Sequence, residues 1–113
     1  MKIGERKVGT NIVVEVHETR LGADRTAAFK EIVGRYREDS DSASIILDLS
    51  QVVFIDSSGL GAIISILKRM PKGTELIICG ATEPVMSMFK LTRLDRVFSM
   101  KATVDDAVNA LAL

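Results

Sequence analysis

The chain has 113 residues, of which 47% are hydrophobic and 27% charged, and this predicts one small globular domain over residues 1–113. Fifteen basic and fifteen acidic residues cancel, and aromatic residues make up only 4%, so the chain lacks the basic field and stacking side chains of proteins that bind nucleic acid directly. It shows neither a signal-peptide core nor an apolar run near the ~20 residues needed to span a bilayer, and we expect a cytoplasmic protein that is monomeric when free.

The N-terminal part predicts two strands and a helix. The strands cover residues 2–8 and 11–17, and alternation in the second places His17, the only histidine, on its more polar face. Neither a catalytic nor a metal-binding role is predicted for this lone histidine. A helix follows over residues 24–37, with Asp24 as its N-cap, and then a polar loop over 38–42. The buried face of this helix is expected at Phe29, Ile32, Val33 and Tyr36.

Strands and helices alternate in the rest of the chain. The nearly continuous apolar run 44–49 is typical of a strand covered on both faces, and residues 52–55 either extend it or form a short turn. A helix then starts near Ser57, and Pro71 stops it. Its buried face is expected at Leu60, Ile63, Ile64 and Leu67.

Two more strand–helix pairs are predicted towards the C-terminus. They are a strand at 74–79, a helix capped by Thr82, a short strand at 97–99 and a last helix capped by Thr103. Cys79, the only cysteine, lies in an apolar run and is expected to be a small buried side chain. This order predicts an α/β sandwich in which about four crossover helices pack against a mixed sheet.

The segment from Val53 to Gly61, with the sequence VFIDSSGLG, is the richest in chemical information. It places hydroxyls at the positive end of a helix, where free N–H groups and the helix dipole favour a phosphate. A hydrolase nucleophile is disfavoured, because the Gly-x-Ser-x-Gly spacing and a nearby histidine base are missing. A nucleotide-binding loop is disfavoured because no Gly-Lys-Ser/Thr follows. The plainest alternative is structural: Asp56 or Ser57 caps the helix, and Gly59 and Gly61 allow close packing.

This segment, with Leu47-Asp48-Leu49 before it, resembles the STAS domain of anti-sigma factor antagonists. The similarity extends over nearly the whole chain and implies a STAS-type sandwich. It also implies that Ser57, directly after the aspartate, accepts a phosphate, and that the protein is not an enzyme and needs no cofactor or metal. The remaining residues of the partner-binding motif would be Asp56, Ser58, Gly59, Leu60 and Gly61.

The resemblance also implies the partners. An anti-sigma factor that is a serine kinase of the histidine-kinase-like ATPase type would bind the unmodified protein and release its target, and phosphorylation of Ser57 would end binding. A PP2C-type phosphatase would reset this switch in bacterial transcription regulation. The segment Leu21-Gly22-Ala23-Asp24 departs from the Gly-Glu-Leu-Asp-like pattern of the family. The rival interpretation is a non-catalytic STAS subunit of a lipid-transport or other regulatory complex.

Overall fold

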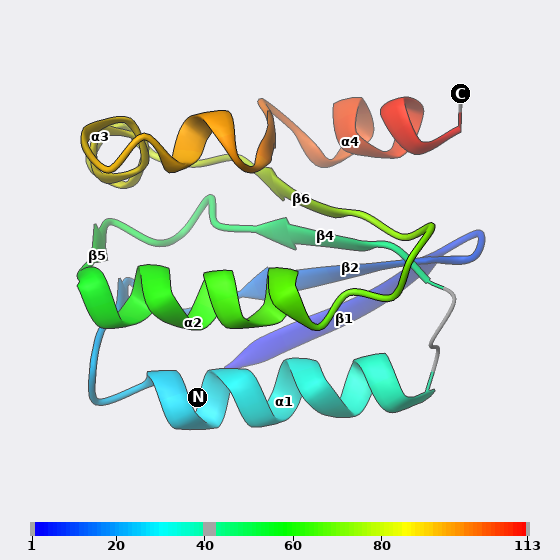
Figure 1. Cartoon of the computed structure of the whole chain (residues 1–113), viewed down its shortest axis with the longest axis horizontal. Coiled ribbons are helices and arrows are strands. Elements are labelled where there is room, and N and C mark those ends of the chain that lie inside the picture. The colour runs from blue at the N-terminus through cyan, green and yellow to red at the C-terminus, as the bar shows by residue number, and fades with distance from the viewer. Residues whose placement is uncertain (1, 40–42, 113) are drawn as a thin grey trace.

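A five-stranded mixed sheet organises the molecule, which is described by a computed structural model for residues 2–39 and 43–112 (Figure 1). The first strand is antiparallel to its neighbour, and all other neighbouring strands of this sheet are parallel. The spatial order is β1 (Ile3–Val8), β2 (Asn11–Val16), β4 (Ile45–Asp48), β6 (Leu76–Cys79) and β7 (Ser99–Lys101). The central position of β4 and β6 explains their continuous apolar sequences, because both of their faces are buried.

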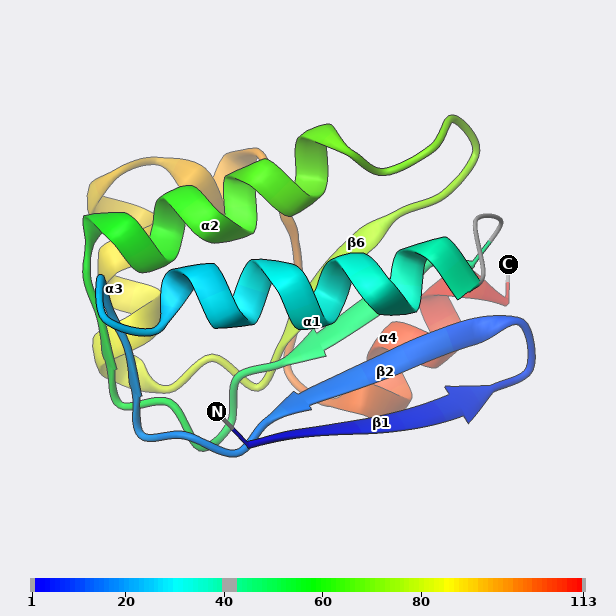
Figure 2. The same cartoon turned by 90° about the horizontal axis from the view of Figure 1, so that it is seen from below.

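Helices cover both faces of this sheet (Figures 1 and 2). The helices α1 (Thr26–Asp39) and α2 (Ser57–Lys68) lie side by side on one face. On the other face α4 (Val104–Leu111) packs against β4, β6 and β7. The remaining helix, α3 (Glu83–Leu91), and the 3₁₀ turn η1 (Leu94–Arg96) follow β6.

The core has two parts, one on each side of the sheet. The larger part holds the buried faces of α1, α2 and α3, and in it the rings of Phe89 and Phe98 meet edge to face at 5.7 Å. The smaller part lies under α4, where Ala107 contacts the other face of the strands. The buried members of this smaller cluster are Val13, Ile46, Ile77, Cys79 and Ala107.

These features confirm the predicted α/β class and the mixed sheet. The first helix begins at Thr26, later than predicted, so Asp24 lies in the preceding turn and its side chain pairs with Arg25 instead of capping the helix. That helix continues to Asp39, so residues 38 and 39 belong to it and not to the predicted loop. Residues 40–42 and the side chain of Tyr36 lie outside the described part of the chain. The cap predicted at Thr103 is confirmed, since its side chain accepts from Asp106 N, and of the two candidates for α2 it is Asp56 whose side chain accepts from Gly59 N. Thr82 lies at the N-cap position of α3, but the predicted side-chain cap is wrong, because its Oγ1 donates to Val52 O instead.

A second, two-stranded sheet was not expected from the sequence. The strand β3 (Arg20–Leu21) pairs in parallel with β5 (Phe54–Ile55), and these pairs lie outside the main sheet. Each strand has two residues, which is too short for any alternation to be visible. The expectation that residues 52–55 extend the preceding strand or form a turn is therefore wrong in detail, because Phe54 and Ile55 pair with a different part of the chain.

The buried cysteine allows a direct test of packing. Burial, and then the nearby charge of Asp48, raise the pKa of the Cys79 thiol to about 12, and only 1% of the residue is exposed. The thiolate is the reactive form, so we expect no reaction with a thiol reagent at pH 8 in the folded protein and rapid reaction in denaturant. Labelling in native buffer as fast as in denaturant would contradict this packing.

Candidate functional site

The most distinctive site lies where β5 passes into α2. Asp56 is the N-cap of α2, with extended backbone angles (φ −107°, ψ −175°), and its Oδ1 accepts a hydrogen bond from Gly59 N at 2.9 Å. Such a bond satisfies one of the N–H groups that the first turn of a helix leaves without an intrahelical partner. The capping function predicted for either Asp56 or Ser57 therefore belongs to Asp56.

The second oxygen of Asp56 joins the site to a distant part of the chain. Its Oδ2 accepts from Ala23 N at 3.2 Å, and Ala23 precedes Asp56 by 33 residues. The hydrogen bond from Gly59 N is the main reason why the pKa of the Asp56 carboxyl lies below its usual value. Desolvation opposes it, and weaker hydrogen bonds, among them the one from Ala23 N, lower the pKa further. Asp56 is consequently ionised at neutral pH and holds the turn before α1 against the start of α2.

Removal of this carboxylate gives a prediction. We expect Asp56→Ala to lower the melting temperature at pH 7 by a few degrees, because two N–H groups lose their acceptor. The pKa of Asp56 is lower in the folded than in the unfolded protein. The carboxylate therefore stabilises the fold fully at a pH above the unfolded-state pKa of about 3.9, and this stabilisation disappears as the pH falls through the folded-state pKa. The melting temperatures of the wild type and of Asp56→Ala should therefore converge in acid. A difference between the two melting temperatures that stays constant down to a pH below the folded-state pKa would contradict this assignment.

Ser57 and Ser58 are the first two residues of α2, and both are exposed. Neither hydroxyl has a hydrogen-bond partner among residues 2–39 and 43–112. A serine hydroxyl that neither caps the helix nor packs in the core is accessible to a modifying enzyme. The structure thus brings the predicted acceptor Ser57 to the surface, directly beside the capping carboxylate.

The glycines of the motif differ in what they require. A Cβ at Gly59 would overlap the carbonyl oxygen of Leu21 and lie 2.8 Å from Ile55 Cγ1, so only glycine fits there. At Gly22 a Cβ would lie 3.0 Å from Asp56 Oδ2, which makes this approach tight as well. A Cβ at Gly61 would meet no atom within 4 Å. Close packing is therefore confirmed for Gly59 and wrong for Gly61.

The sequence did not reveal the contribution of β3. Through its pairing with β5, the backbone of Leu21 comes against α2, and the Arg20 guanidinium lies 4.3 Å from the centre of the Phe54 ring in a cation–π contact. Phe54 and Val53 expose 40% and 53% of their surface next to the start of α2. The only sequence feature that pointed to this region was the departure from the family pattern at Leu21-Gly22-Ala23-Asp24. This segment contacts the site through the backbone amide of Ala23, which donates to Asp56, and not through the acidic side chain of Asp24.

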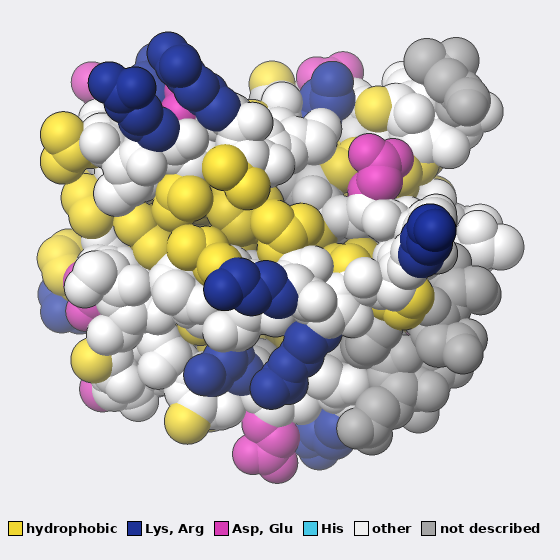
Figure 3. Space-filling view, viewed as in Figure 1, with side chains coloured by type: hydrophobic (Ala, Val, Ile, Leu, Met, Phe, Trp, Pro, Cys, Tyr) yellow, Lys and Arg dark blue, Asp and Glu magenta, His cyan; other side chains and the backbone are white. Residues whose placement is uncertain are grey.

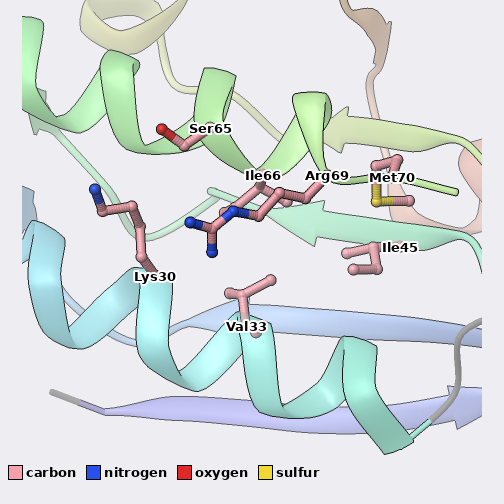
Figure 4. A pocket seen from close by; sticks show the side chains of 8 residues that line it. Lys30, Val33, Ile45, Ser65, Ile66, Arg69 and Met70 are labelled. Carbon is pink, nitrogen blue, oxygen red and sulfur yellow. The ribbon is translucent and has the colours of Figure 1, made fainter.

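A groove lies between α1 and α2, away from this site (Figure 4). Lys30 and Arg69 extend over an apolar floor that includes Val33, Ile45 and Ile66. Its volume is about 30 Å³, enough for one or two water molecules, whereas pockets for small molecules usually have ~300–1,000 Å³. The groove therefore has no room for a substrate.

Other reactive groups do not assemble into a centre. His17 is exposed, as predicted, and its Nδ1 lies 3.0 Å from Gln51 Nε2. Within the described residues no group of three or more His, Cys, Asp or Glu side chains could hold a metal ion. No helix in the same residues is long and apolar enough to cross a membrane.

Comparisons with known proteins agree with this geometry. The family model of the STAS domain matches residues 6–107. A candidate anti-sigma factor antagonist of Thermotoga maritima is 29% identical over 103 residues, which are 90% of this chain and 91% of its own. An anti-sigma F factor antagonist of Paenibacillus polymyxa is 37% identical over 68 residues, 59% of this chain and 56% of its own. The fold matches the solved structure of the anti-sigma factor antagonist SpoIIAA in its unphosphorylated form with a TM-score of 0.81, at 18% identity and over 98% and 96% of the two chains.

Proposed function

This chain belongs to the STAS domain family, and on that premise we propose that it is an anti-sigma factor antagonist controlled by phosphorylation of Ser57. The unmodified protein binds an anti-sigma factor and thereby frees the target that this factor holds. The anti-sigma factor is also a serine kinase, which transfers the γ-phosphoryl group of ATP to the Ser57 hydroxyl, with loss of the hydroxyl proton and release of ADP. A PP2C-type phosphatase removes the phosphate with water.

One observation supports this proposal above the others. Asp56 supplies the N-cap of α2, so the hydroxyl of Ser57 is exposed and has no structural task among the described residues. A phosphate at this first residue of the helix is tolerated because of the helix dipole, which favours it by roughly 0.3–1 kcal/mol. The Asp56 carboxylate beside it has the opposite effect, so the fold itself should change little in stability.

The effect of the phosphate is expected in the complex. It adds about −1.5 to −2 charges at pH 7 to a surface that the kinase must cover. A charge that is buried in an interface without a partner weakens binding strongly. In this proposal the protein is the substrate of a kinase and catalyses nothing, and it acts in the cytoplasm, where ATP is available.

The experiment uses wild-type protein, Ser57→Ala and Ser57→Asp as baits in lysate of the source cell, with bound proteins identified by mass spectrometry. We expect Ser57→Ala to recover an ATP-binding kinase that Ser57→Asp does not recover. The purified kinase with ATP should then phosphorylate the wild type and leave Ser57→Ala unmodified. Recovery of one set of partners by all three baits would overturn the proposal and favour a STAS subunit of a lipid-transport or other regulatory complex.

A further inference from the structure

The groove between α1 and α2 has two chemically different ends. Figure 4 shows Lys30 extending from α1 and Arg69 extending back from the end of α2, so that both cationic groups lie towards the same end of the groove. The side chains of Ile45 and Met70 lie at the other end, and Ile45 belongs to the buried core. The groove therefore has a place for a charged head and a separate place for an apolar tail.

The two cations at the head end are not neutralised by a carboxylate. Every ion pair within the described residues involves Arg25, so neither Lys30 nor Arg69 has an acidic partner there. Further Lys and Arg side chains lie over α1 and α2 on the same face of the molecule (Figure 3). An anion at this end would gain charge-assisted hydrogen bonds, and a guanidinium group matches the two oxygens of a carboxylate.

A glycine keeps the groove open. Gly34 lies within α1 and lines the groove. A Cβ at this position would meet no atom of the described residues within 4 Å, so no contact in that part of the protein requires glycine there. Glycine in a helix interior is less stable than alanine. The fold thus gives up helix stability at Gly34 and leaves space that a ligand can occupy.

The size of the groove limits the apolar tail. A volume of about 30 Å³ accepts one or two groups the size of a water molecule, so an aliphatic tail of about two to three carbons fits while the head remains at the mouth. Among the described residues that line the groove there is no histidine, cysteine or carboxylate. The groove can therefore bind such a molecule but has no group with which to transform it.

From these features we propose that the groove between α1 and α2 binds a short-chain carboxylate of the size of propionate. Its carboxylate accepts hydrogen bonds from Lys30 and Arg69, and its tail lies over Ile45 and Met70. This ligand joins α1 to α2 and stabilises the folded protein by mass action. The proposal does not depend on phosphorylation of Ser57.

The test is a titration of isotope-labelled protein with sodium propionate, followed by the amide chemical shifts in NMR spectra. We expect saturable shifts at Lys30, Gly34 and Arg69, with a dissociation constant in the millimolar range. Sodium chloride controls for the charge of the anion and propylammonium chloride for the tail, and neither should give saturable shifts. Lys30→Met and Arg69→Met should each weaken propionate binding about fivefold or more, because each removes a charge-assisted hydrogen bond.

Gly34→Ala separates binding from stability. The added methyl group occupies space in the groove, so we expect a higher melting temperature together with propionate binding weakened about fivefold or more. Gly61→Ala is the matched control, because its Cβ also meets no atom within 4 Å but lies outside the groove. It should raise the melting temperature in the same way and leave propionate binding unchanged.

The length of the acid gives a second readout. Affinity should rise from acetate to propionate and should not rise further from butyrate to hexanoate, because the groove ends. An affinity that keeps increasing with chain length would indicate adsorption to exposed apolar side chains and would overturn the proposal. It is equally wrong if propionate gives no saturable shifts, if chloride gives the same shifts, or if Gly34→Ala binds propionate as well as the wild type does. None of these results involves the kinase, so they leave the test of the proposed function separate.

Discussion

Ser57→Asp is expected to weaken binding to the kinase by ~30- to several-thousand-fold relative to Ser57→Ala, which corresponds to about 2–5 kcal/mol for an uncompensated charge in an interface. The side chain is exposed on the first turn of α2 and has no hydrogen-bond partner in the described residues, so the substitution removes no internal contact. Aspartate is also well accepted in the first turn of a helix. Calorimetry with the purified kinase measures the affinity, and thermal unfolding measures the stability.

The matched variant for this prediction is Ser58→Asp, which places the same charge one residue further along α2. Ser58 is exposed too, but a helix turns by about 100° per residue, so its side chain points in a different direction. We expect a smaller loss of affinity for Ser58→Asp than for Ser57→Asp. A large fall in the melting temperature of Ser57→Asp would show that it acts through the fold and not through the interface.

Gly59→Ala is expected to cause the largest loss of stability among single-methyl changes in the motif, about 3 kcal/mol or more. The added Cβ would overlap the Leu21 carbonyl oxygen, which is backbone and cannot rotate away, and would also press on Ile55. To accommodate it, β3 must separate from the start of α2, which would also disturb the Asp56 to Ala23 hydrogen bond. Equilibrium unfolding in urea measures the difference.

Gly61→Ala provides the control, because it adds the same methyl group to the same helix two residues later. No atom lies within 4 Å of the added Cβ, and the residue is exposed. Alanine is a better helix former than glycine, so we expect a gain of about 0.5–1 kcal/mol. Equal destabilisation by both substitutions would mean that a local effect of the added methyl group on α2 itself, and not the contact with Leu21, determines the cost.

The main sheet and the helices could be predicted from the sequence because their signals are long and periodic. The apolar runs around Ile46 and Ile77 identified central strands, and the spacing of Leu60 and Ile63 identified the buried face of α2. The caps at Asp56 and Thr103 could be predicted because each requires only a polar residue in front of an apolar helix.

The support of the site could not be predicted in this way. The pairing of β3 with β5, the fit of Gly59 against Leu21 and the bond from Ala23 to Asp56 all join segments more than 30 residues apart, and nothing in their local sequence indicates the partner. For the same reason the sequence did not distinguish Gly59 from Gly61. Local patterns show which residues can form a helix or a cap, whereas only the tertiary structure shows which backbone lies against them.

The hydrogen bond between Ala23 and Asp56 determines when Ser57, the proposed phosphate acceptor, has its final surroundings. The start of α2 has its final shape only after the chain around β3 has reached it, because the Ala23 amide and the Leu21 carbonyl form one wall of the site. A short peptide around Ser57, or an unfolded chain, lacks that wall. A kinase that recognises this folded shape would phosphorylate only folded molecules. The extent of phosphorylation would then report on the amount of folded protein and not on the total amount of chain.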